Sequence, residues 1–252
     1  MARPADGGGA LPRCGPPALI LAVGVRGSAS TWAFNVAREL AEAALGSGRV
    51  AACFANTPAD LAAAAAGGAA CVVCKTHGMA GLARLSGQEG TRLIVTIRDP
   101  RDAVLSLIGR FGAPPPAALR GVAESCNAVL GCAARDTPVL RYEDGFFEQA
   151  ETVAQLAQHL GLQVAAAEQT RIFAAWRTAS VRAFAATVPT LPAGRLVDDG
   201  ATFCFDRLTQ VHRTHIGDGR VGKWRDRFGP AARADLVRVF GPFLGRFGYP
   251  PE

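Results

Sequence analysis

Short apolar runs alternate along this chain with segments in which apolar residues recur every three or four positions. Runs of the first kind are typical of buried strands, and the second pattern is typical of amphipathic helices. The apolar runs predict strands at 18–24, 50–54, 70–75, 92–97 and 138–142. The helical pattern covers 31–45, 58–66, 101–111, 116–134, 148–160 and 165–185. This alternation predicts an α/β fold in three layers, with a central parallel sheet covered by helices.

The same pattern predicts how the chain divides. We expect one domain over 18–252, preceded by a flexible tail over 1–17 in which glycine and proline are frequent. A chain of 252 residues with 49% hydrophobic and 19% charged residues can bury one full core. The segment 189–222 is rich in glycine and charge and lacks periodicity, so we expect it to fold over a ligand.

The junction between the first strand and the first helix, within 18–32, has the strand, tight loop and helix arrangement of a phosphate cradle. Measured against the nucleotide triphosphatase loop G-x-x-x-x-G-K-[ST], Gly24 and Thr31 match. Ala29 and Ser30 stand where that loop has its second glycine and its lysine. The remaining backbone N–H groups and hydroxyls suit a smaller anionic group that needs no magnesium.

A second anion site is predicted where the strand at 92–97 ends on Arg98 and a helix begins after Pro100. The helix N-terminus and the guanidinium would both present donors to the same crevice. An ordinary surface turn, in which Arg98 and Arg101 pair with Asp102, is the alternative for this segment taken alone.

Candidate residues follow four of the predicted strands, and the carboxyl ends of parallel strands meet at one edge of a sheet. The loop after Gly24 follows the first strand, Lys75 and His77 the third, Arg98 the fourth and Tyr142 the fifth. We therefore expect one site at this edge.

Five motifs occur in one order between Gly24 and Phe228, which is nearly the whole chain apart from its ends. They are Arg-Gly-Ser-Ala-Ser-Thr-Trp, Cys-Lys-Thr-His, Ile-Arg-Asp-Pro-Arg-Asp-Ala-Val-Leu-Ser, Arg-Tyr-Glu-Asp and Gly-Arg-Val-Gly-Lys-Trp-Arg-Asp-Arg-Phe. In these motifs the chain resembles the PAPS-dependent sulfotransferases. The resemblance implies a single domain with a P-loop-like loop that binds the phosphosulfate. It also implies transfer of a sulfuryl group from PAPS to a hydroxyl or amine of a small-molecule or carbohydrate acceptor, with PAP as product and without a metal.

The resemblance also implies residue roles. His77 would be the general base, with Lys75 beside the transferring group. Trp32 would stack on adenine and Tyr142 would contact the base, although either also fits an ordinary core position. Arg98 and Ser106 would bind the 3′-phosphate, at the family's spacing. The remaining cofactor-binding candidates are the loop residues Gly27, Ser28, Ala29, Ser30 and Thr31 and the later residues His215, Gly219, Arg220 and Lys223.

Two positions depart from the family pattern. Gly27 stands where members place a lysine or arginine against the bridging oxygen, and Arg26 is the nearby cation that could replace it. Gly217 and Asp218 replace a basic pair that clamps the 3′-phosphate. A catalytically silent PAPS- or PAP-binding protein therefore stays an alternative, and a P-loop phosphotransferase is a weaker one because of Ser30.

Composition narrows the classes of partner and compartment. A net charge of +6 favours anionic ligands, but no lysine-rich run or interleaved aromatic pattern points to nucleic acid. Seven cysteines indicate reduced thiols in a cytoplasmic protein, and Cys71 and Cys74 are expected to be core thiols without a metal. We expect neither a secretory signal nor a membrane span. The dimerisation motif of cytosolic members is not visible, and loops 78–90, 110–120 and 186–214 are expected to wall the acceptor.

Overall fold

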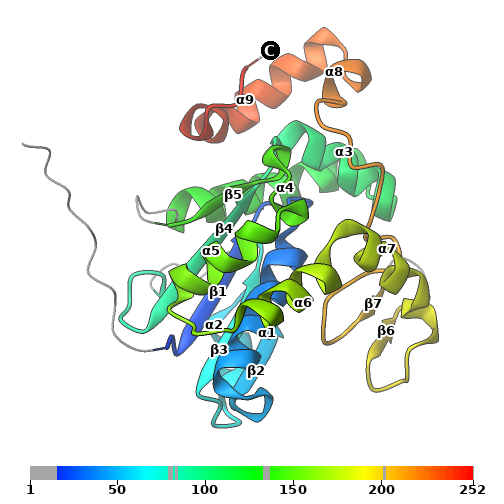
Figure 1. The fold of residues 1–252 in the computed structure, drawn as a ribbon. Helices are drawn as coiled ribbons and strands as arrows, with labels where there is room; N and C mark the ends of the chain where they lie inside the picture. The colour runs from blue at the N-terminus through cyan, green and yellow to red at the C-terminus, as the bar shows by residue number, and fades with distance from the viewer. Residues whose placement is uncertain (1–15, 79–81, 83–84, 133–136, 201–202, 252) are drawn as a thin grey trace, which may run out of the picture.

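Five parallel strands form the central sheet, in the order β2-β3-β1-β4-β5 (Figure 1). The computed structural model describes residues 16–78, 82, 85–132, 137–200 and 203–251. The parallel sheet is confirmed, and each predicted strand end lies within one residue of the observed end. The strands are β1 (Leu19–Gly24), β2 (Val50–Phe54), β3 (Cys71–Thr76), β4 (Thr91–Ile97) and β5 (Val139–Arg141).

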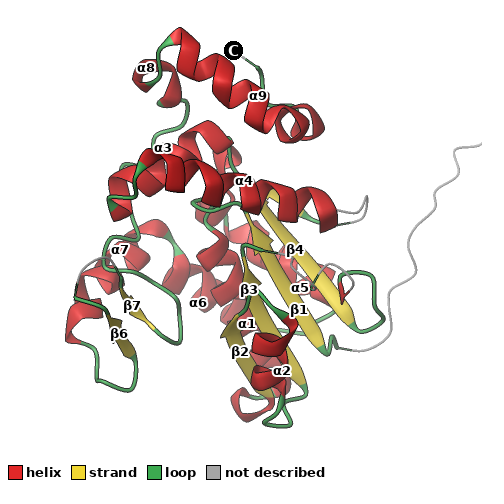
Figure 2. Ribbon diagram, turned by 180° about the vertical axis from the view of Figure 1, so that it is seen from behind, coloured by secondary structure: helices red, strands yellow, loops and turns green. Residues whose placement is uncertain are grey.

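Helices cover both faces of this sheet, which is why its central strands can be apolar on both sides (Figure 2). Ile20 and Ala22 of β1 point into one core, whereas Leu21 and Val23 point into the other. The first core is closed by α1 (Ser30–Leu45), α5 (Ala150–Leu160), α6 (Ala166–Trp176) and α7 (Thr178–Thr187). The second is closed by α2 (Pro58–Ala65), α3 (Pro100–Phe111), α4 (Pro115–Cys132) and α9 (Pro230–Phe247).

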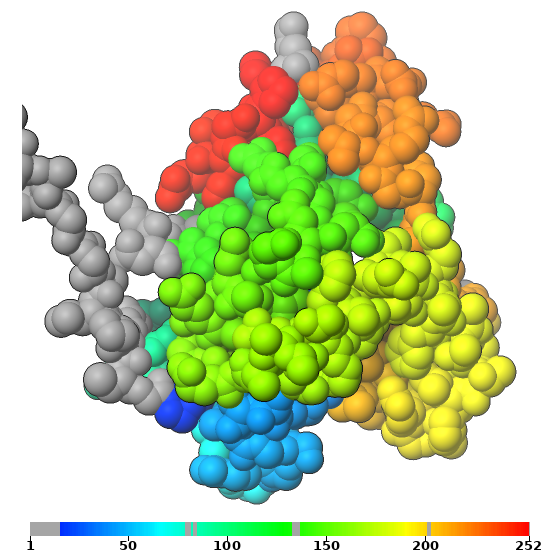
Figure 3. Space-filling view, viewed as in Figure 1, coloured from blue at the N-terminus to red at the C-terminus, as the bar shows by residue number. Residues whose placement is uncertain are grey.

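The second half of the chain differs from the prediction. The helix expected over 165–185 is two helices, because Arg177 between α6 and α7 is extended, with ψ at 155°. The aperiodic stretch contains a small antiparallel hairpin, β6 (Leu196–Asp198) and β7 (Cys204–Asp206), which lies beside α7 and apart from the main sheet (Figure 1). In the space-filling view this part of the chain, in yellow, forms one side of the molecule (Figure 3). Helices α8 (Trp224–Arg227) and α9 had not been predicted. Most of the expected tail, residues 1–15, lies outside the described residues.

Asp102 at the start of α3 ties the last quarter of the chain to the sheet edge. Its carboxylate accepts hydrogen bonds from the backbone N–H groups of Gly222 and Trp224, the latter at 3.0 Å. The neighbouring Arg101 guanidinium lies 3.7 Å from the centroid of the Trp224 ring. This tether brings the preceding loop beside Arg98, whose Nη2 donates to the carbonyl of Arg220 at 3.0 Å.

Gly24 at the end of β1 is a position where no side chain fits. A Cβ there would lie 2.2 Å from Thr96 Oγ1 and 2.6 Å from Ser30 Cβ. We expect Gly24→Ala to lower the free energy of unfolding by about 1–3 kcal/mol, because the sheet edge must move apart to admit the methyl group. Denaturant unfolding of the purified protein measures this change.

Gly245→Ala provides the matched control, since a Cβ at this position of α9 meets nothing within 4 Å. Alanine should stabilise the helix there by about 0.5–1 kcal/mol. Equal effects of the two substitutions would contradict the close contact at Gly24.

Candidate functional site

The loop between β1 and α1 is held in one conformation by backbone geometry and by Ser28. Gly27 has φ at 80° and Ala29 has φ at 61°, both in the left-handed region. The Ser28 hydroxyl donates to the carbonyl of Val25 at 2.6 Å and contacts Thr96 Oγ1 at 2.7 Å. Ser28 therefore fastens the loop to β4, and it borders neither of the cavities described below. Its expected contact with an anion stays an untested prediction.

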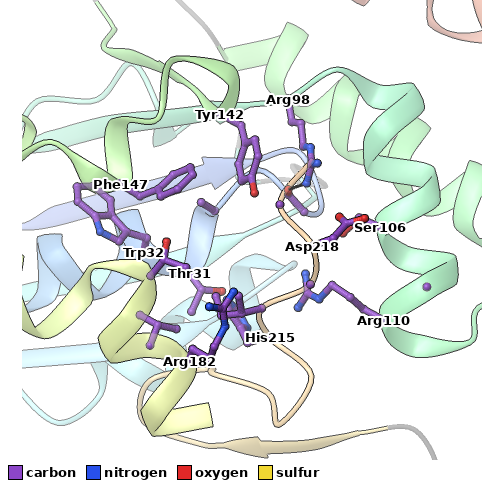
Figure 4. Close-up of a pocket in the computed structure, with 18 of the residues that line it drawn as sticks. Thr31, Trp32, Arg98, Ser106, Arg110, Tyr142, Phe147, Arg182, His215 and Asp218 are labelled. Atoms are coloured by element: carbon purple, nitrogen blue, oxygen red, sulfur yellow. Dashed lines mark hydrogen bonds between the residues drawn. The ribbon is translucent and has the colours of Figure 1, made fainter. Parts of the chain in front are cut away.

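A first cavity of about 420 Å³ lies along one side of this loop. Aromatic side chains of Trp32, Phe147 and Tyr142 lie along one side, Arg98 lies beside Tyr142, and Arg110 and His215 lie on other parts of the lining (Figure 4). Candidates from the sequence that border it are Gly27, Ala29, Thr31, Trp32, Arg98, Ser106, Tyr142, His215, Gly219 and Lys223. The sheet edge and the tethered loop thus bring together most of the expected cofactor-binding residues.

Arg98 is the most constrained cation of the first cavity. It is 3% exposed, and its guanidinium lies 4.0 Å from the centroid of the Tyr142 ring. Nη1 donates to the carbonyl of Gly27 at 3.1 Å, whereas the buried Nε has no partner among the described residues. Ser106 lies beside the same glycine, since a Cβ at Gly27 would be 3.5 Å from Ser106 Oγ.

The tethered loop supplies a different set of side chains from the one expected. Lys223 borders the first cavity with its Nζ 2.9 Å from Asp218 Oδ1. Arg220 does not border either cavity in the described structure, because its guanidinium turns to Asp226 at 2.9 Å and its side chain is 61% exposed. Arg220 instead contributes its carbonyl, which accepts from Arg98. Lys223 is therefore the better placed of the two cations.

A second cavity, of about 630 Å³, meets the first at Gly27, Ala29, Thr31, Arg110 and His215, which border both. Lys75 and His77 at the end of β3 line the second cavity, together with Arg26 and Ser30. Two of the expected acceptor walls border it as well, through residues 111–114 and residues between 203 and 212. The third expected wall, 78–90, has no described residue that borders this cavity.

His77 is oriented as a neutral base. Its Nδ1 lies 2.7 Å from the carbonyl oxygen of Gly24. Because a carbonyl can only accept, Nδ1 carries the proton and Nε2 keeps its lone pair. Burial, followed by the positive charges of Lys75 and Arg26, holds the pKa of His77 well below its ordinary value. The imidazole is therefore ready to accept a proton at neutral pH.

Lys75 connects the base to the anion loop. Its Nζ donates to Thr31 Oγ1 at 2.7 Å. Burial, followed by the positive charges of Arg110 and Arg26, lowers the pKa of Lys75 to about 7. The chain has two lysines, Lys75 and Lys223, and both border the cavities.

Three further groups at the site were not predicted from the sequence. Arg110 of α3 points in where the cavities meet, opposite Thr31 and His215 (Figure 4), and burial lowers its pKa to about 10. Its position four residues after Ser106 places both on one helix face, a spacing that could have revealed it. His212 lines the second cavity and Arg182 of α7 lines the first, in regions where the chain carries no recognisable motif.

Arg26 lies on the side of the second cavity that faces α4. Its backbone N–H donates to Ser125 Oγ at 3.1 Å, and its Nε would be 3.3 Å from a Cβ at Gly121. It does not border the first cavity. The expectation that Arg26 replaces the loop cation missing at Gly27 stays an untested prediction.

Known structures with the same fold were determined in complex with PAP. Mouse sulfotransferase SULT7A1 complexed with PAP matches with a TM-score of 0.60 at 12% identity, over 90% of this chain and 84% of that one. Retinol dehydratase in complex with retinol and PAP matches with a TM-score of 0.58 at 14% identity, over 92% of this chain and 82% of that one. Retinol dehydratase in complex with androsterone and PAP matches with a TM-score of 0.55 at 14% identity, over 92% of this chain and 82% of that one. The chain therefore has the PAPS-dependent sulfotransferase fold.

Comparisons by sequence add no relative. No family model matches the chain, and no curated protein matches it. Within the described ranges, no helix is long and apolar enough to cross a membrane. No three or more His, Cys, Asp or Glu side chains in those ranges are grouped so that they could hold a metal ion.

The two lysines allow a direct test of the electrostatics. We expect the Lys75 amine to titrate near pH 7 in the free protein, because burial and neighbouring arginines disfavour its charged form. Carbon-13 labelling of lysine gives signals from two side chains, and Lys75→Met identifies which belongs to Lys75. A Lys75 signal that stays constant through neutral pH would contradict the burial and charge described here.

Proposed function

We propose that this protein is a PAPS-dependent sulfotransferase that transfers a sulfuryl group to a hydroxyl or amine of a small-molecule or carbohydrate acceptor. The observation that carries the proposal is the meeting of two cavities at Thr31 and Arg110, with His77 in one and Arg98 in the other. The first cavity suits a nucleotide and the second suits an acceptor. A group passing between them crosses the loop after β1.

The first cavity fits PAP chemically. Its volume of about 420 Å³ is in the range of small-ligand sites. Trp32, Tyr142 and Phe147 offer apolar ring surfaces for a base, and the buried N–H groups Trp32 Nε1 and Arg98 Nε lack partners in the described structure. Arg98 and Lys223 would hold the 3′-phosphate, with Ser106 beside them. The loop from Gly27 to Thr31 would hold the 5′-phosphosulfate at the start of α1.

PAPS would supply the sulfuryl group, and the acceptor oxygen or nitrogen would displace PAP from it. His77 Nε2 would take the proton from the acceptor, since Nδ1 is already committed to Gly24. Lys75 would stabilise negative charge near Thr31, and Arg110 would do so where the cavities meet. Both cations are fixed before the reaction, so little reorganisation is needed.

A catalytically silent PAP-binding protein is the second candidate, and Gly27 is the observation that favours it. Glycine has no side chain, and with φ at 80° this position disfavours any other residue, so position 27 offers no cation to the leaving oxygen. Incubation with PAPS labelled in the sulfate and an acceptor panel, with and without magnesium and ATP, separates the candidates. Transfer supports the sulfotransferase, tight PAP binding without transfer supports the silent protein, and ATP turnover supports a phosphotransferase.

Replacing the general base should greatly slow sulfuryl transfer and leave the affinity for PAP unchanged. We expect His77→Ala to lower kcat by about 10²–10⁴-fold, the usual contribution of a positioned base, with an unchanged Kd for PAP. The matched control is His159→Gln, because His159 borders neither cavity. Normal turnover by His77→Ala would remove this residue from the mechanism.

Arg98 and Arg220 form a second matched pair. We expect Arg98→Met to weaken PAP binding by about 1.5–3 kcal/mol, the range for a charge-assisted contact, and to weaken AMP binding less because AMP lacks the 3′-phosphate. Arg220→Met should change neither affinity, since its guanidinium is paired with Asp226 outside the cavity. Calorimetric titration measures all four affinities. An equal loss of PAP and AMP affinity in Arg98→Met would show that Arg98 does not bind the 3′-phosphate.

A further inference from the structure

The second cavity is lined by aromatic side chains, and the described residues that border it include no acidic side chain. Rings from the end of α3 and from the β7 region surround His212, with centroid distances of 5.2 Å to Phe111 and 5.0 Å to Phe205. Phe54 lies 5.9 Å from the His77 ring, centroid to centroid. None of the described residues that border this cavity is Asp or Glu. The cavity therefore suits a flat apolar molecule and carries unbalanced positive charge.

Arg26 is a cation of the second cavity that does not border the first cavity. Lys75 is hydrogen-bonded to Thr31, and Arg110 borders both cavities, so these two cations lie toward the sulfuryl group. Arg26 borders the second cavity and not the first. Its backbone bond to Ser125 and its contact with α4 fix it there.

The Arg26 guanidinium has no ion-pair partner in the described part of the chain. Its Nε is buried without a hydrogen-bond acceptor, and Glu124, the acid whose charge it senses, is exposed on α4. A half-buried guanidinium is unfavourable without an anion beside it, and guanidinium pairs with a carboxylate through two parallel hydrogen bonds. An acceptor that brought a carboxylate would complete this side of the cavity.

We propose that the acceptor is an aromatic molecule that carries both a hydroxyl group, directed to His77, and a carboxylate, bound by Arg26. This inference rests on the proposed function and narrows its substrate class. The ring would lie against the phenylalanines, with the hydroxyl group at His77 and the carboxylate at Arg26. Acceptors that lack the negative group would leave Arg26 unpaired.

The test compares 3-(4-hydroxyphenyl)propanoate with its primary amide, which has nearly the same shape and no charge. At saturating PAPS we expect wild-type kcat/KM to favour the carboxylate by about 10–100-fold, the effect of one charge-assisted contact. Arg26→Met should remove this preference by raising KM for the carboxylate far more than KM for the amide. Arg120→Met is the matched control, because Arg120 is exposed on α4 and borders neither cavity.

The outcomes separate the two proposals. A loss of kcat in Arg26→Met that is equal for both acceptors would place Arg26 at the transferring group and overturn this inference. If the wild type transfers to neither compound, the affinities of both for the PAP-bound protein decide the matter by calorimetry. A carboxylate preference that depends on Arg26 would then support the inference, whereas the acceptor panel decides the proposed function. Equal affinity, or no binding of either compound, would overturn the inference.

Discussion

The site depends on one buried carboxylate, that of Asp102, which accepts hydrogen bonds from two backbone N–H groups of the Gly222–Trp224 segment. Together with the hydrogen bond from Arg98 to the Arg220 carbonyl, this contact determines where the chain after the β6–β7 hairpin returns. Trp224 is fully buried against Arg101, so apolar packing holds this segment in addition to the hydrogen bonds of Asp102. The loop that precedes it can then lie over Arg98 and close the first cavity with His215, Gly219 and Lys223.

Close approach of backbone segments determines the other half of the site. Gly24 allows β1 to end against Thr96, and the Ser28 hydroxyl joins the following loop to the same strand. This packing fixes the Gly24 carbonyl that orients His77, so the base and the anion loop are positioned by one turn of chain. A change in the turn would therefore disturb both the binding of the nucleotide and the protonation of the base.

The sequence was most informative where local pattern and tertiary position coincide. The buried strands are apolar because both sheet faces are covered, and residues that follow strand ends had to meet at one edge, so Lys75, His77, Arg98 and Tyr142 could be placed together. Side-chain direction was not accessible in this way: Ser28 turns to β4 and Arg220 turns to Asp226. The break at Arg177 involves neither glycine nor proline, and Pro242 interrupts the pattern of α9. His212 lies in a segment without hydrophobic periodicity, so the sequence pattern did not identify it as a site residue.

The crowding of positive groups around Thr31 has a consequence for how a ligand enters. Lys75, His77 and His215 each have a lowered pKa, caused first by burial and then by one another or by Arg110. A polyanion that binds among them reverses that repulsion and raises their proton affinity. Binding would then be accompanied by proton uptake from the solvent, and by linkage the affinity for the anion would fall as the pH rises above neutrality. These groups repel one another in the free protein, and a negatively charged ligand relieves that repulsion.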